Sequence, residues 1–183
     1  MRVLHAAAAL GMKCKAHVDE IDPIAGAEMA AACGCITAEH LIQASDEGIA
    51  AMAEKNVIAA LLPATSFYLE KSFARARLMV DQGVAVAVAT DFNPGSSPNF
   101  NLQFAMNLAC LRYRLTPAEA LTAVTLNGAA AIDRAEQVGS LEAGKKADVV
   151  VWDVPDLESV FYRYGANLVH TVVKNGRVYP VLQ

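Results

Sequence analysis

Long apolar runs are absent from this sequence of 183 residues. Its apolar stretches, such as residues 84–89, fall far short of the roughly 18 residues that a membrane-spanning helix requires. Clusters of lysine and arginine are absent too, and 15 basic against 19 acidic side chains leave a net charge of -4. This balance argues against a nucleic acid or a membrane as the main partner, so we expect a small molecule instead.

Signals for export are also missing. The alanines at residues 6–9 are followed by no convincing cleavage site, so the N-terminal residues are not typical of a signal peptide. The motif Cys33-Gly34-Cys35 has no second cysteine pair to complete a zinc site. With Cys14 and Cys110 it predicts reduced, mostly buried thiols in a cytoplasmic protein.

Hydrophobic residues make up 55% of the chain and charged residues 19%, which excludes disorder and allows a sizeable core. The apolar periodicity alternates between strand and helix. Strands are predicted over 13–17, 35–40, 57–62 and 84–90, and helices over 1–11, 24–32, 45–55, 70–82, 102–113 and from 117 onward. The strands are apolar on both faces, which is typical of a parallel sheet covered by helices.

The pattern changes in the last quarter of the chain. Strands are predicted over 147–153 and 168–174, and Asn175-Gly176 favours a hairpin turn. We therefore expect two domains: β/α units over 1–135 and a small β domain over 136–183. Four β/α units are about half of a closed eight-stranded barrel, which typically needs about 250 residues. The chain is thus either a small open sheet or part of something larger.

Polar residues stand where the predicted parallel strands end, which is where such folds place reactive groups. They are His17 and Glu20 after the first strand, His40 after the second and Asp91 after the fourth. Imidazole and carboxylate groups at one rim can hold a divalent ion and leave positions open for water. The ion would acidify that water, and Glu20 or Asp91 could take its proton during attack on a carbonyl carbon.

Simpler readings of the same residues stay open. His17 can be a hydrogen-bonded histidine at a strand end, Asp91 a turn former, and His40 a satisfied core residue. Glu20 and its neighbour Asp19 can be solvated loop charges. The loop over 93–97 could alternatively cradle a phosphate or carboxylate through backbone N–H groups.

Six segments carry a family resemblance: KAHVDE at 15–20, AEHL at 38–41, LLPATSFYL at 61–69, ATDFNPGSSP at 89–98, NLQ at 101–103 and GSLEAGKKAD at 139–148. Over essentially its whole length the chain resembles the imidazolonepropionases, enzymes of histidine degradation in the amidohydrolase superfamily. The small departures are Glu39 where the family usually has Asp, Ala64 for Gly, and Ser96 for Thr, which keeps the hydroxyl.

The resemblance implies hydrolysis of the cyclic amide of 4-imidazolone-5-propanoate to N-formimidoyl-L-glutamate at one Zn or Fe ion. His17 and Asp91 match the metal ligands, and Asp91 is counted among the catalytic residues. Glu20 matches a substrate contact that also handles the proton of the attacking water, and His40 matches a histidine that assists at the carbonyl. Asn93, Gly95 and Ser96 match the substrate loop, and the family implies a homodimer.

One departure from the family is large. The His-x-His pair and the Arg, Tyr and His substrate contacts of the family's first half are not present here. The resemblance therefore implies an α/β fold that is the C-terminal half of a TIM-like (β/α)8 metal-dependent hydrolase barrel plus part of a small β-sandwich domain. Another amidohydrolase substrate, a cyclic amide or a deaminase substrate, is the alternative. A second alternative is a non-catalytic half-barrel that associates with a partner through its edge strands.

Overall fold

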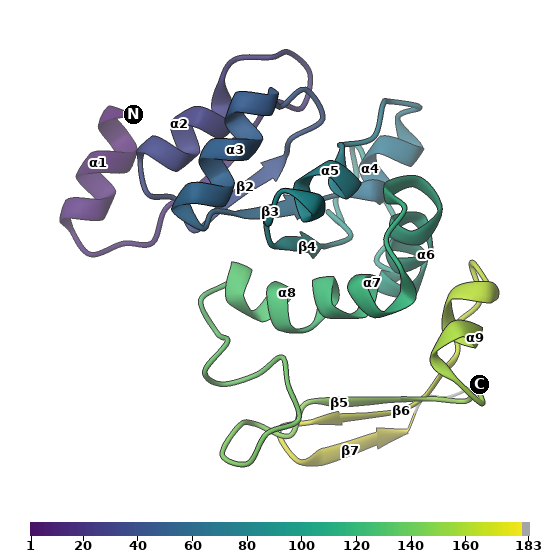
Figure 1. Ribbon diagram of the computed structural model, residues 1–183. Helices are drawn as coiled ribbons and strands as arrows, with labels where there is room; N and C mark the ends of the chain where they lie inside the picture. The colour runs from purple at the N-terminus through teal and green to yellow at the C-terminus, as the bar shows by residue number, and fades with distance from the viewer. Residues whose placement is uncertain (181–183) are drawn as a thin grey trace.

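A four-stranded parallel sheet forms the centre of the molecule. The computed structural model describes residues 1–180, and its main sheet has the order β1-β2-β3-β4 (Figure 1). These strands are β1 (Lys15–Val18), β2 (Thr37–His40), β3 (Ile58–Leu61) and β4 (Val86–Val88). All neighbouring pairs run parallel. The expected succession of β/α units is confirmed.

Nine helices lie in the described part of the chain. They are α1 (Arg2–Ala9), α2 (Gly26–Ala32), α3 (Asp46–Lys55), α4 (Pro63–Tyr68), α5 (Ala76–Asp81), α6 (Leu102–Tyr113), α7 (Pro117–Val124), α8 (Leu126–Ala131) and α9 (Leu157–Tyr162). The capping box predicted at the start of α7 is present, because Thr116 and Glu119 each bond the other's backbone N–H. None of these helices has the length and apolar character that a bilayer crossing needs.

The helix predicted over 70–82 is shorter than expected. Only α5 is helical there, and the residues before it run without regular structure; the Arg75 guanidinium in this segment donates to the carbonyl of Ala44 at 2.6 Å. The sequence reading also missed α4, although Pro63 at its first position is a recognised start signal. Both differences follow from tertiary contacts and turn chemistry that apolar periodicity does not report.

The core lies between the sheet and the helices packed on it. Strands β2, β3 and β4 are almost entirely buried, as expected for a covered parallel sheet. The expectation of two apolar faces is wrong for β1, where Lys15 and His17 are exposed and Ala16 and Val18 are buried. On this strand only one face is covered, so His17 projects from the open face beside Lys15.

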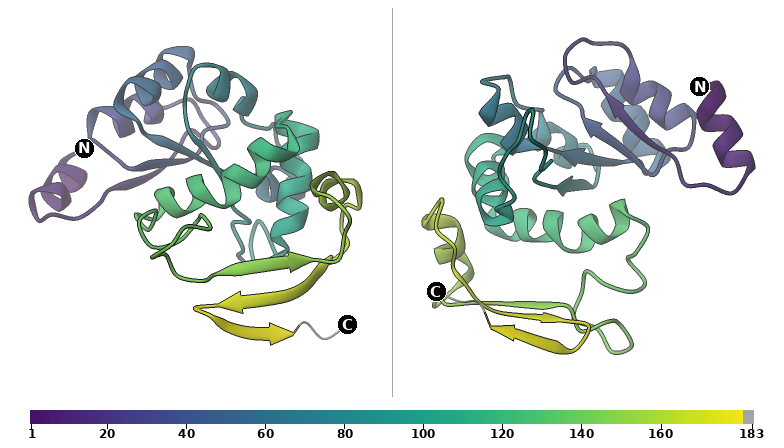
Figure 2. Two further views of the ribbon diagram at one scale, coloured as in Figure 1. Left: turned by 60° about the horizontal axis from the view of Figure 1, so that its bottom comes forward. Right: turned by 180° about the vertical axis from the view of Figure 1, so that it is seen from behind.

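The C-terminal segment forms a separate antiparallel sheet of β5 (Val149–Trp152), β6 (Val169–Lys174) and β7 (Arg177–Pro180). Figure 2 shows α7 and α8 lying between this sheet and the parallel sheet. The predicted Asn175-Gly176 turn is confirmed, with φ of 51° and 78° as that hairpin requires. The predicted boundary near residue 135 falls in the connection between α8 and β5.

Strands β1 and β4 are the two edges of the parallel sheet, as the half-barrel reading expects. The edge at β4 is partly covered, because the Asn127 side chain on α8 donates to the Val86 carbonyl at 2.8 Å. The described residues place no strand beyond β1. The sheet is thus open at one edge and capped at one point on the other.

Candidate metal and hydrolase site

The site begins with His17, the third residue of β1. Strand alternation turns its side chain to the open face, where 66% of it is exposed. Its partner residue on β2 is Glu39, which pairs with Lys15 at 3.3 Å and accepts a hydrogen bond from Thr37. The open face of the sheet therefore carries polar groups from both strands.

The loop after β1 is held by the buried Asp19, which is 2% exposed. One of its carboxylate oxygens accepts from the N–H groups of Ile24 and Gly26 at 3.0 Å, and the other accepts from Ala27 at 2.8 Å. Asp19 thereby caps α2, whose own N-cap residue Ala25 has no side chain that can do so. The reading of Asp19 as a solvated loop charge is wrong.

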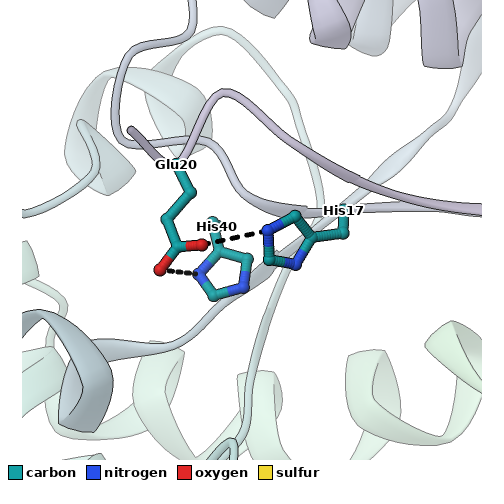
Figure 3. A group of neighbouring side chains, drawn as sticks. All are labelled: His17, Glu20 and His40. Atoms are coloured by element: carbon teal, nitrogen blue, oxygen red, sulfur yellow. Dashed lines mark ion pairs between the residues drawn. The ribbon is translucent and has the colours of Figure 1, made fainter. Parts of the chain in front are cut away.

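Glu20 connects the two histidines. Its Oε2 lies 2.9 Å from Nε2 of His17, and its Oε1 lies 3.6 Å from Nδ1 of His40 (Figure 3). Only 19% of its side chain is exposed, so it is not a freely solvated charge. The imidazole rings of His17 and His40 meet edge to face, with centroids 4.3 Å apart.

His40 ends β2 in a left-handed conformation, with φ of 70°, and Leu41 follows with φ of 58°. Such angles are costly for residues other than glycine and concentrate at functional sites. The side chain is 5% exposed, and this burial lowers the pKa of His40, with Glu20 acting in the opposite direction. A neutral imidazole results, able to donate from one ring nitrogen and accept at the other.

These three side chains form a possible metal-binding group. One donor atom from each of His17, Glu20 and His40 lies within 4.8 Å of those of the other two. Two imidazoles and a carboxylate are ligands that zinc and ferrous iron accept, so the donor set suits a divalent metal. Within residues 1–180 no other group of histidine, cysteine or acidic side chains meets this criterion.

Asp91 follows β4 at the same carboxyl edge of the sheet, but it is not one of those three donors. Its φ is 52°, again left-handed, and its Oδ2 accepts a hydrogen bond of 2.6 Å from the Thr65 hydroxyl. The charge of Asp91 acts to raise the pKa of His40, against the larger effect of burial. Its role as a metal ligand remains a prediction.

The loop after Asp91 is closed by its own hydrogen bonds. The Asn93 side chain accepts from the N–H of Gly95 at 2.9 Å and of Ser96 at 2.8 Å, and it donates to the Asp91 carbonyl at 2.7 Å. The Ser96 hydroxyl also bonds Asn93. The three loop residues predicted to contact substrate are thus brought together, and their contact with a ligand, like that of Glu20, stays a prediction.

Comparison with known proteins gives the family. A model of the family described as "Amidohydrolase family" matches residues 3–179 of the chain. The chain belongs to the amidohydrolase family. It is 56% identical over 176 residues to the imidazolonepropionase of Geobacillus sp. (strain WCH70), covering 96% of this chain and 42% of that protein. It is 55% identical to the imidazolonepropionase of Brevibacillus brevis, covering 97% of this chain and 42% of the other. The chain therefore spans less than half the length of these relatives.

Solved structures of other amidohydrolases share the fold. An adenosine deaminase from Xanthomonas campestris with bound zinc matches with a TM-score of 0.83 at 24% identity, over 98% of this chain and 48% of that one. The atrazine chlorohydrolase TrzN from Arthrobacter aurescens TC1, complexed with zinc, matches with a TM-score of 0.80 at 23% identity and the same coverage. The expected fold class, part of an amidohydrolase barrel followed by a small β domain, is confirmed.

Two residues of this amidohydrolase site escaped the sequence reading. Asp19 caps a helix seven residues away, and Thr65 reaches Asp91 across 26 residues of chain. Thr65 stands in the family segment at 61–69, just after a buried strand and Pro63, but neither signal indicates a bond to Asp91. All four cysteines are free in the structure, as expected.

Proposed function

We propose that this amidohydrolase hydrolyses the cyclic amide C–N bond of 4-imidazolone-5-propanoate, giving N-formimidoyl-L-glutamate in the breakdown of histidine. The observation that carries the proposal is the His17, Glu20 and His40 group at the carboxyl edge of the parallel sheet. It occurs in a chain 50–56% identical to proteins named imidazolonepropionase. Relatives this similar favour the same substrate over other amidohydrolase substrates.

The proposed cofactor is one divalent ion, zinc or iron, held by His17 and Asp91. The His17 side chain is 66% exposed, its Nδ1 has no hydrogen-bond partner within residues 1–180, and Oδ1 of Asp91 accepts no hydrogen bond there either. Both atoms suit such an ion. When bound, the ion would supply Lewis acidity, making water a nucleophile near neutral pH and polarising the substrate carbonyl.

Glu20 and His40 supply the proton handling in this proposal. Glu20 takes a proton from the attacking water as the water oxygen bonds to the carbonyl carbon, and this proton passes to the leaving nitrogen as the C–N bond breaks. His40, kept neutral by burial, donates a hydrogen bond to the carbonyl oxygen as negative charge develops there. Oε1 of Glu20 lies 3.6 Å from Nδ1 of His40, so the two groups can act on the same substrate carbonyl.

The loop formed by Asn93, Gly95 and Ser96 is the proposed substrate contact. Its internal hydrogen bonds hold the loop rigid beside Asp91, so little ordering is required when substrate binds. The cyclic amide and the carboxylate of the substrate offer both acceptors and donors to these groups.

The activity belongs, in this proposal, to a unit larger than residues 1–183. The relatives are more than twice as long, and β1 and β4 offer edges at which further strands can pair. We propose that residues 1–135 contribute four β/α units to a barrel and 136–183 contribute strands to the small domain. The free thiols favour the cytoplasm, and a dimer is proposed for the assembled enzyme.

The proposal is tested by supplying the missing portion. The chain is co-expressed with the part of a relative that it does not match, metal content is determined, and ring opening is followed by loss of the imidazolone absorbance. We expect turnover that requires both polypeptides and that falls at least about 100-fold in Glu20→Gln and Asp91→Asn. Asp22→Asn, an exposed loop carboxylate nearby, is the matched control and should keep full turnover.

Three results would each contradict a part of the proposal. A metal-loaded complex that opens no ring removes the substrate assignment. Turnover that survives replacement of Glu20 and of Asn93 removes the assigned roles and favours a different amidohydrolase substrate. A stable monomer of the chain, measured by size-exclusion chromatography with light scattering, argues against the need for a partner.

A further inference from the structure

Thr65 lies where two neighbouring strand ends meet. Helix α4 begins two residues after β3 ends, and Thr65 is its third residue. The parallel register pairs Leu61 at the end of β3 with Val88 at the end of β4, so the start of α4 lies beside Asp91. The Thr65 side chain is buried, at 1% exposed, and its hydroxyl donates to Oδ2 of Asp91 at 2.6 Å.

The backbone around Asp91 is fixed independently. The Asn93 amide donates to the Asp91 carbonyl at 2.7 Å, and the buried Ser97 hydroxyl donates to the Thr90 carbonyl at 2.6 Å. The main chain of Asp91 therefore cannot rotate without breaking these bonds. The side-chain torsions are its remaining freedom, and the Thr65 hydroxyl is the one described group that restrains them.

The two oxygens of the Asp91 carboxylate are consequently unequal. Oδ2 is engaged by Thr65, while Oδ1 has no hydrogen-bond partner among residues 1–180. A free carboxylate can bind an ion or a water through either oxygen or both. A buried hydroxyl that holds one oxygen leaves the other as the acceptor and fixes its direction.

We propose that Thr65 is a positioning residue that locks the Asp91 carboxylate so that Oδ1 alone faces the site. This inference rests on the proposed function, which makes Asp91 a ligand of the catalytic ion. Partners of ligating carboxylates commonly account for 10–100-fold in metal affinity. Thr65 acts through Asp91 and touches neither ion nor substrate.

The test uses three single substitutions in the full chain. Thr65→Val removes the hydroxyl with little change of shape, Thr65→Ser restores it, and Ser66→Ala removes the neighbouring buried hydroxyl, which does not bond Asp91 in the described structure. Crystal structures of the metal-free proteins report the orientation of the Asp91 carboxylate. Titration with Co²⁺ alone, followed by visible absorption and calorimetry, reports affinity and coordination geometry.

We expect the Asp91 carboxylate to turn or become disordered in Thr65→Val and to stay in place in Thr65→Ser and Ser66→Ala. Cobalt affinity should fall about 10–100-fold in Thr65→Val, with a changed absorption spectrum, and return with serine. Thermal unfolding of each variant separates this effect from a general loss of stability, because Ser66→Ala loses a buried hydroxyl without losing the Asp91 contact.

The outcomes separate the two proposals. An unchanged Asp91 orientation in Thr65→Val overturns the positioning role, whatever the metal data show. Measurable but equal cobalt binding, with the same spectrum, in Thr65→Val and the unsubstituted chain overturns it as well. If the unsubstituted chain, co-expressed with the missing portion of a relative, binds no Co²⁺ while the carboxylate still turns in Thr65→Val, Thr65 keeps its positioning role and the proposed metal site fails.

Discussion

Removal of the Asp19 carboxylate tests the loop that carries Glu20. In Asp19→Ala the N–H groups of Gly26 and Ala27 remain buried with no acceptor, while that of Ile24, at an exposed residue, can find water. A buried donor left without a partner costs about 1–3 kcal/mol, so two such donors give a loss of about 2–6 kcal/mol. That is a large part of the roughly 5–15 kcal/mol that holds most domains folded.

Asp19→Asn provides the graded comparison. Its amide oxygen can keep the bonds to Ile24 and Gly26, but its NH₂ group then faces the N–H of Ala27, so we expect a loss of about 1–3 kcal/mol. The exposed Asp22→Ala is the matched control and should stay within about 0.5 kcal/mol of the unsubstituted chain.

Urea unfolding followed by circular dichroism measures these differences as shifts of the midpoint at constant slope. The expected order of loss is Asp19→Ala, then Asp19→Asn, then Asp22→Ala. If Asp19→Ala unfolds within about 1 kcal/mol of the unsubstituted chain, the carboxylate does not hold α2 and the explanation of the Glu20 loop is wrong.

Three further predictions concern other parts of the fold. The Arg77 guanidinium lowers the pKa of Glu119 to about 2, so the stability from this pair is present above pH 4.5 and is lost as the pH falls towards 2. Glu119→Gln should reduce this loss of stability in acid by on the order of 1 kcal/mol, measured as urea midpoints at a series of pH values. Gly26→Ala should cost about 1–3 kcal/mol in the same assay, because the added carbon would lie 2.3 Å from Cβ of Val18. Burial of Cys35 and partial burial of Cys110 raise the pKa of each thiol to about 11. Both should therefore react with a thiol reagent at pH 8 far more slowly in the folded chain than in urea, and equal rates would contradict this shielding.

The sequence allowed the strand ends to be located, and with them most of the site. His17, His40 and Asp91 could be singled out because parallel strands bring their carboxyl ends to one edge, and a polar residue after an apolar run is visible in the letters alone. The pairing of Glu20 with both histidines could not be predicted, since it depends on how the Asp19 loop folds back. The bond from Thr65 to Asp91 depends on the register of β3 with β4, which no local pattern specifies.

The open edge of β1 has a consequence for handling the protein. Because the carbonyls of Cys14 and Val18 bond towards β2, the peptide groups of Lys15 and His17 point outward and are available to any extended chain. The ammonium group of Lys15 is the main obstacle to such pairing, although Glu39 partly neutralises it. Concentrated solutions of the isolated polypeptide should therefore associate edge to edge, and more readily at high ionic strength, where this charge repels less.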